Sequence, residues 1–189
     1  LDVLLRQSGA WTVARALPVL REIALAIDAS WAKAVGHGAL HPRDIFISTG
    51  PADVRVSGFG IGQALEAVGA KSPVRRPYSA AERGDGSSWD IRADVYSLGV
   101  VACELLSGQR PVGSDDGGEA VALRLAQGEP GELSPEASAA VQRVLAVAMA
   151  DLPADRYETA VAFVEALAGA AQPASVAAAP DAQTVPKRA

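Results

Sequence analysis

A dense run of apolar residues between Val95 and Leu106 constrains this fold more than any other feature of the sequence. Leu98 and Leu105 recur within it at helical spacing, and Gly108, a residue common just beyond the last turn of a helix, follows it. A helix that is apolar on most of its faces has to be surrounded by other elements. We therefore expect a buried central helix with further helices packed around it.

Other segments have the amphipathic pattern that such packing requires. Apolar residues repeat at steps of three and four from Thr12 to about Ala34, with Thr12 as the expected N-cap. Pro18 is expected either to kink this helix or to delay its start, because proline lacks the N–H that an interior turn needs. Three later helices are predicted, at residues 119–127, from residue 134 onward and at residues 159–167.

The remaining segments predict a hairpin, a long loop and a tail. Two β-prone runs, residues 45–48 and 54–57, flank a turn-like stretch, so the fold class is mainly α with a small β hairpin (α+β). Residues 58–92 have weak periodicity and predict a long loop, which is usually a functional feature. Ala, Pro, Gln, Ser and Thr dominate from residue 169 onward. We therefore expect a folded domain over residues 1–168 and a linker or disordered tail over residues 169–189.

Composition excludes several classes of protein. The 189 residues are 49% hydrophobic and 21% charged, as in globular domains, and the net charge of −5 argues against nucleic acid as a partner. No apolar run approaches the roughly 18 residues that a membrane segment needs. The single cysteine, Cys103, is expected to be buried and fits a cytoplasmic location. Because the chain begins at Leu1 without a methionine, we expect it to be part of a longer product.

Several short motifs follow one another along the chain. Residues 37–47 read His-Gly-Ala-Leu-His-Pro-Arg-Asp-Ile-Phe-Ile, and residues 58–60 read Gly-Phe-Gly after the expected hairpin. Ala-Ala-Glu ends at Glu82, Asp-Val-Tyr-Ser-Leu-Gly spans residues 94–99, and Arg156 precedes the last helix. This order resembles the large, C-terminal lobe of bacterial-type Ser/Thr protein kinases. The resemblance covers about residues 1–168 and implies that the small lobe, with its nucleotide-holding lysine, is absent from this chain.

The resemblance places the family's chemical groups where this sequence has other residues. The catalytic aspartate corresponds to Ala39, which cannot accept a proton. The metal-binding aspartate corresponds to Gly58, which offers Mg²⁺ no side-chain oxygen, and the loop lysine corresponds to His41, which is mostly neutral near pH 7. The loop asparagine corresponds to Asp44, which is a candidate metal ligand or, alternatively, a hydrogen-bonding or capping residue.

Residues that the resemblance assigns to architecture are kept. His37 and Phe59 match an internal stack of side chains, Asp94 matches the anchor of the catalytic loop, and Glu82 with Arg156 matches a buried ion pair. The kept positions are His37, Phe59, Gly60, Glu82, Asp94, Gly99 and Arg156. The sequence therefore predicts a kinase-like shape without intact catalytic residues.

These substitutions lead to hypotheses from different functional classes. In the first, the chain is a catalytically defective kinase-like domain, a pseudokinase, that binds a protein partner such as a kinase or an effector through residues 61–92. No cofactor is expected in that case. In the alternative, it is a weak or unconventional ATP-dependent Ser/Thr protein kinase, in which an unseen small lobe with ATP and Mg²⁺, and groups such as Asp44 or Glu66, restore activity. A third hypothesis, an all-α adaptor with an accidental resemblance, predicts a fold without the hairpin.

Two further groups of residues leave alternatives open. Arg75, Arg76 and Arg83 are either a solvated loop face or a contact for an acidic or phosphorylated peptide. His37 and His41 lie four residues apart without further ligands in the sequence nearby, so packed and surface histidines are favoured over a zinc site.

Overall fold

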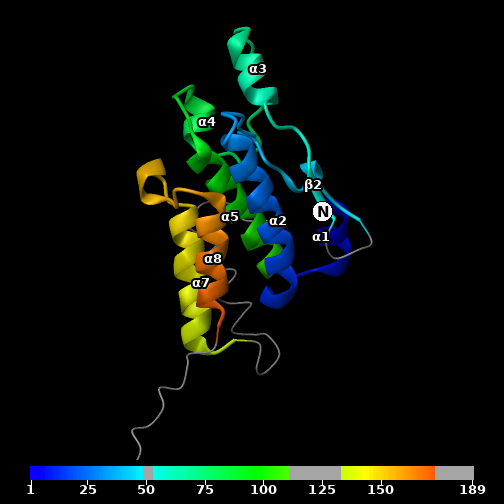
Figure 1. Cartoon of the computed structure of the whole chain (residues 1–189). Helices are drawn as coiled ribbons and strands as arrows, with labels where there is room; N and C mark the ends of the chain where they lie inside the picture. Colours follow the sequence, from blue (N-terminus) through cyan, green and yellow to red (C-terminus); the bar gives the residue numbers. More distant parts are fainter. Residues whose placement is uncertain (49–52, 111–132, 173–189) are drawn as a thin grey trace, which may run out of the picture.

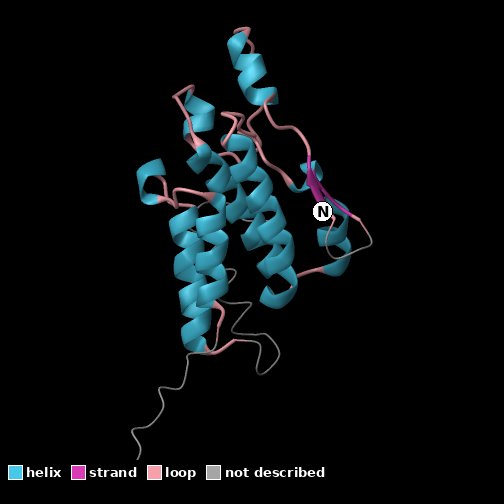
Figure 2. Ribbon diagram, in the orientation of Figure 1, coloured by secondary structure: helices cyan, strands magenta, loops and turns pink. Residues whose placement is uncertain are grey.

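The computed structural model describes residues 1–48, 53–110 and 133–172 and is mostly helical with one small hairpin (Figure 1, Figure 2). In chain order the elements are α1 (Asp2–Ser8), α2 (Val13–Trp31), η1 (Pro42–Asp44), β1 (Ile45–Ile47), β2 (Val54–Val56), α3 (Ile61–Ala67), α4 (Glu82–Asp85), α5 (Ile91–Ser107), α7 (Pro135–Ala148), η2 (Pro153–Asp155) and α8 (Ala160–Ala170). Strands β1 and β2 are antiparallel and pair Ile45 with Val56, which confirms the predicted hairpin. None of the helices in the described ranges is both long and apolar enough to cross a membrane.

Helix α5 lies at the centre of the molecule, as predicted, and 13 of its 17 residues are buried. Helices α2, α7 and α8 all contact it (Figure 1). Its close approach to α7 depends on Gly99, because a Cβ at this position would lie 2.9 Å from Met149 Cγ and 3.1 Å from Ala148 Cβ. Cys103 is buried in the same helix, where burial raises the pKa of its thiol to about 12.

Helix α2 begins where the sequence predicted but ends earlier. Its first residue is Val13, and the Thr12 side chain caps it by accepting a hydrogen bond from a backbone N–H of the first turn. Pro18 lies inside the helix, so the alternative of a later start is wrong. The helix ends at Trp31 rather than near residue 34, because the chain then turns into the loop that carries His37.

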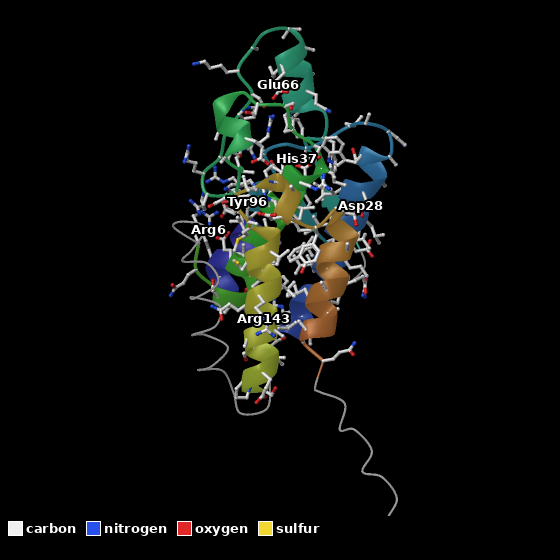
Figure 3. All side chains as sticks on the ribbon, turned by 90° about the vertical axis from the view of Figure 1, so that its left-hand side faces the viewer. Arg6, Asp28, His37, Glu66, Tyr96 and Arg143 are labelled. Carbon is white, nitrogen blue, oxygen red and sulfur yellow. The ribbon has the colours of Figure 1, made fainter. Side chains whose placement is uncertain are left out.

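The last helix is capped by a residue of α2. Asp28 accepts hydrogen bonds from Ala160 N at 2.9 Å and from Val161 N at 3.1 Å, and Figure 3 shows it beside the start of α8. A carboxylate there satisfies free N–H groups and complements the helix dipole. Since α8 continues to Ala170, the predicted start of the tail at residue 169 is slightly too early. Residues 173–189 and the predicted helix at residues 119–127 lie outside the described residues.

The prediction of one continuous loop over residues 58–92 is wrong, because this stretch contains α3 and α4. Helix α3 projects from the helical body (Figure 1) and is held there by Gln63. The Gln63 side chain accepts a hydrogen bond from Gly36 N at 2.9 Å and donates one to Ala34 O at 3.2 Å. On the outer side, Ile61 and Val68 are 55% and 77% exposed. Polar residues therefore attach this helix to the protein, while apolar residues face solvent.

Candidate functional site

The loop at residues 37–44 is anchored to the central helix by Asp94. The Asp94 carboxylate accepts hydrogen bonds from His37 N at 2.9 Å and Gly38 N at 2.7 Å, and from Trp31 Nε1 at 2.7 Å. Complete burial raises the pKa of this carboxyl, although the three hydrogen bonds favour its ionised form. The backbone of the loop is thus fixed at its start by one buried side chain.

His37 is packed inside this loop and does not face an open site. Its Nδ1 accepts a hydrogen bond from Ala39 N at 3.4 Å, so its Nε2 donates to Ser57 O at 2.9 Å. The imidazole ring meets the Phe59 ring edge-on, with 5.4 Å between the ring centroids. The structure therefore brings together the two residues that the sequence assigned to an internal stack.

Gly58 lies against His37 in a left-handed backbone conformation. Its φ is +96°, and a Cβ at this position would lie 3.1 Å from His37 Nε2. Two residues later, Gly60 also has a positive φ, of +78°, and its N–H donates to Gly36 O at 2.8 Å. The chain thus passes close to the loop at the position where the resemblance predicts a metal-binding aspartate in the family.

Ala39 and His41 are both buried and fill structural roles. Ala39 is 3% exposed, and His41 Nδ1 caps the short helix η1 by accepting a hydrogen bond from Arg43 N at 3.0 Å. The His41 ring packs edge-on against Tyr78 at 4.5 Å between centroids. Burial first, and then the nearby Arg75 guanidinium, lower the pKa of His41. A neutral imidazole in this position cannot supply the positive charge of a lysine.

Asp44 is occupied by partners within the protein. Its Oδ2 accepts a hydrogen bond from His41 N at 3.1 Å and forms an ion pair with Arg75 Nη1 at 2.5 Å, while His37 Nε2 lies 3.6 Å away. Within the described ranges no three His, Cys, Asp or Glu side chains form a group that could hold a metal ion. Asp44 and the two histidines are neighbours, but the side chain closest to the carboxylate is a guanidinium.

Glu82 and Arg156 form a buried ion pair between α4 and the segment before α8. Arg156 Nη1 lies 2.6 Å from Glu82 Oε1, and Nη2 lies 3.2 Å from Oε2, so the contact is bidentate. The same guanidinium also donates to the carbonyl oxygens of Ala150, Asp151 and Arg92. This network ties the end of residues 58–92 to the helical body.

Arg83 and Glu66 form a second cluster that the sequence did not predict. The Arg83 side chain is 3% exposed and donates to Gly38 O at 2.8 Å and Ser72 Oγ at 2.6 Å, while its Nη1 pairs with Glu66 at 2.8 Å. Trp89 covers this guanidinium and donates to Glu66 at 3.0 Å. Partial burial alone would raise the pKa of Glu66, but the hydrogen bonds from Trp89 and Arg83 hold it below its usual value. Figure 3 shows Glu66 and His37 at the same end of the molecule.

These contacts correct the prediction for the three arginines. Arg83 is buried and fully engaged, and Arg75 is paired with Asp44, so neither lies on a free solvated face. Only Arg76 of the three is exposed without a hydrogen bond or ion pair to another described residue. Sequence reasoning missed these pairings because the partners come from loops 31 and 45 residues apart, where no periodic pattern relates them.

Comparisons with known proteins relate this arrangement to one family. The family model described as protein kinase domain matches residues 1–165. The Ser/Thr-protein kinase PknJ of Mycobacterium tuberculosis is 35% identical over 175 residues, covering 87% of this chain and 30% of PknJ. PknA of the same organism is 30% identical over 176 residues, covering 89% of this chain and 39% of PknA.

Solved structures agree with this relation at the level of the fold. The crystal structure of the Mycobacterium tuberculosis PknI kinase domain matches with a TM-score of 0.63 and 25% identity, and covers 88% of this chain and 59% of that chain. A double mutant of the same domain matches with a TM-score of 0.67 at 24% identity over 87% of this chain and 58% of that one. The chain thus spans less than two thirds of each of these relatives. The match over residues 1–165 places it, nevertheless, in the protein kinase domain family.

Proposed function

We propose that this chain is the large lobe of a Ser/Thr kinase-like domain that has lost catalysis and acts as a protein-interaction or regulatory module. The observation that carries the proposal is that three positions, 39 and 41 in the loop and 58 after β2, lack the side chains that catalysis would need. Ala39 is a buried methyl group, His41 is a neutral cap stacked on Tyr78, and Gly58 has no side chain to hold a metal.

The chemistry explains why these positions matter together. Phosphoryl transfer requires Mg²⁺ held against the phosphates, a positive group near the transferred phosphate and a base or positioning group at the acceptor hydroxyl. Removing a general base alone typically slows a reaction by about 10²- to 10⁴-fold. Mg²⁺ needs oxygen ligands, and the carboxylate of Asp44, in the same loop, is already paired with Arg75.

The alternative of an unconventional kinase draws no support from the groups expected to compensate. Asp44 is paired with Arg75, and Glu66 is paired with Arg83 and bonded to Trp89. Both carboxylates would have to leave their partners before they could bind a metal or accept a proton. ATP with Mg²⁺ therefore enters the proposal only as the ligand whose binding tests it.

For the interaction role, the region around α3 is the proposed contact surface. Ile61 on this helix and Val68 directly after it expose apolar side chains, and Gln63, Glu66 and Trp89 are among the residues that line an open cavity of about 760 Å³. Exposed apolar side chains and an open cavity in the same segment of the chain favour a protein partner, such as a kinase or an effector. A cytoplasmic setting, in which Cys103 stays reduced, belongs to the same proposal.

The test is a titration of ATP, with and without Mg²⁺, on the full-length protein that contains this chain, followed by a phosphotransfer assay with an active kinase as positive control. We expect no phosphotransfer, and any nucleotide binding to be the same with and without Mg²⁺. Binding that Mg²⁺ strengthens, together with transfer of phosphate to a peptide, would overturn the proposal and favour the kinase alternative.

A further inference from the structure

The contact between Asp44 and Arg75 joins two parts of the chain that are far apart in sequence. Arg75 Nη1 lies 2.5 Å from Asp44 Oδ2, across a separation of 31 residues. The Asp44 side chain is 16% exposed and the Arg75 side chain 40% exposed, so the carboxylate lies inside the pair and the guanidinium covers it from solvent. The positively charged Arg75 side chain therefore lies on the outside of the loop at residues 37–44, against Asp44.

Arg75 is held in place by its own backbone. Its N–H donates to Ser79 Oγ at 2.9 Å, and its carbonyl oxygen accepts from Ser79 N at 3.0 Å. These two hydrogen bonds hold residues 75–79 in a turn and thereby fix the position of the Arg75 Cα. A long side chain that is fixed at its base loses less conformational entropy when it forms an ion pair.

The charges around Asp44 match a single cation. Of the loop positions that the resemblance assigns to catalysis or metal binding, positions 39 and 58 contribute no carboxylate and position 44 contributes one. One guanidinium neutralises one carboxylate, whereas a divalent cation would leave an excess of positive charge beside Arg75.

We propose that Arg75 is an internal counter-cation that occupies Oδ2 of Asp44 and fastens residues 72–79 to the loop at residues 37–44. This inference rests on the proposed noncatalytic function and extends it to the regulation of the same site. A divalent cation can bind Oδ2 of Asp44 only by displacing the Arg75 guanidinium, which already lies 2.5 Å from this oxygen.

The adjacent residue supplies a matched control. Arg76 has the same side chain, is exposed, and makes no hydrogen bond or ion pair with another residue in the described part of the chain. Arg75→Gln and Arg76→Gln therefore remove the same charge from neighbouring positions. Only the first should affect Asp44.

The probe is Mn²⁺ without nucleotide, and the readout is the paramagnetic broadening of backbone amide signals at residues 43–46 in ¹⁵N-labelled protein. In Arg75→Gln we expect Mn²⁺ to broaden these signals at least fivefold more than in the unmodified protein. Arg76→Gln and Arg75→Lys, which retains a cation, should both resemble the unmodified protein. The Asp44→Asn/Arg75→Gln double variant should lose the added broadening, because the metal would have no carboxylate to bind.

Hydrogen exchange on the same variants tests the fastening of residues 72–79. Exchange at these amides should be at least tenfold faster in Arg75→Gln than in Arg76→Gln. Equal Mn²⁺ broadening in Arg75→Gln and the unmodified protein, or equal effects of the two glutamine variants, would overturn the proposal. If Arg75→Gln fails to fold, the double variant should fold again because it removes both charges, and its failure to do so would equally refute the pair's role. Because no nucleotide is used, this result is independent of the ATP test of the proposed function.

Discussion

Replacing Gly58 by alanine tests the description of the site most directly, because its cost can be worked from two structural terms. The left-handed backbone, with φ of +96°, costs an ordinary residue about 1–2 kcal/mol. The new Cβ would lie 3.1 Å from His37 Nε2 and 3.4 Å from Cε1, so the ring has to move. It cannot move freely, because Nε2 bonds to Ser57 O and the ring packs on Phe59. Weakening that hydrogen bond adds about 0.5–1.5 kcal/mol, for a total of about 1.5–3.5 kcal/mol.

Gly69→Ala separates these two terms. Gly69 also has a positive φ, of +72°, but a Cβ there would have no atom within 4 Å. This variant should therefore lose only the backbone term of about 1–2 kcal/mol. Urea unfolding followed by tryptophan fluorescence gives both losses, provided that the m value is unchanged. We expect Gly58→Ala to lose about 1 kcal/mol more than Gly69→Ala. Equal losses would refute the claim that His37 fills the space beside position 58.

Three further variants test the surroundings of the site. Glu82→Gln should lower the free energy of unfolding by about 3–5 kcal/mol, since it leaves the fully buried Arg156 guanidinium without a counter-charge; a loss below 1 kcal/mol in urea would contradict this. Asp28→Ala should cost about 1–2 kcal/mol and speed hydrogen exchange in the first turn of α8, and unchanged exchange there would show that the cap is unimportant. Because the pKa of His41 is lowered from 6.5, the unfolded chain binds this proton more readily, so stability should fall as pH drops below about 6.5. His41→Asn keeps a capping group and should flatten that part of the pH dependence, as measured by urea unfolding at several pH values.

The helical framework was predictable because its signals are local. Helix α5 is apolar on most of its faces and ends just before Gly108, and α2 begins at Val13, directly after the capping residue Thr12 at the start of an amphipathic repeat. The hairpin likewise follows from two short β-prone runs about a turn. Each of these features depends on residues within one element.

The short helices could not be predicted in the same way. Helix α3 has seven residues, too few to repeat an apolar face, and no side chain caps its start at Gly60. It is fixed instead by Gln63, which bonds to the backbone near residues 34–36 from a distance of 27 residues along the chain. Helix formation over so few residues depends on such tertiary contacts, which the sequence does not reveal.

For the candidate site, motif spacing located the positions but not their partners. The sequence placed Asp44 in the loop and grouped Arg75, Arg76 and Arg83 as one basic stretch. In the fold these three arginines have three different environments: an ion pair with Asp44, solvent, and a buried cluster under Trp89. Which arginine pairs with which carboxylate depends on the three-dimensional path of the backbone, which the spacing of residues in the sequence does not give.

This distribution of charge gives a physical reason why the proposed loss of catalysis can accompany retention of the fold. Several carboxylates gathered around an empty metal site repel one another and destabilise the folded chain until a cation binds. Of the three positions that the resemblance assigns to a base or a metal ligand, 39, 44 and 58, only position 44 carries a carboxylate here, and Arg75 neutralises it without any external ion. His41 then serves as a neutral cap in a position where a lysine would face the Arg75 cation. In the proposed noncatalytic role, His41 and Asp44 therefore stabilise the folded loop, and the charge of Asp44 is balanced by Arg75 without a bound metal ion.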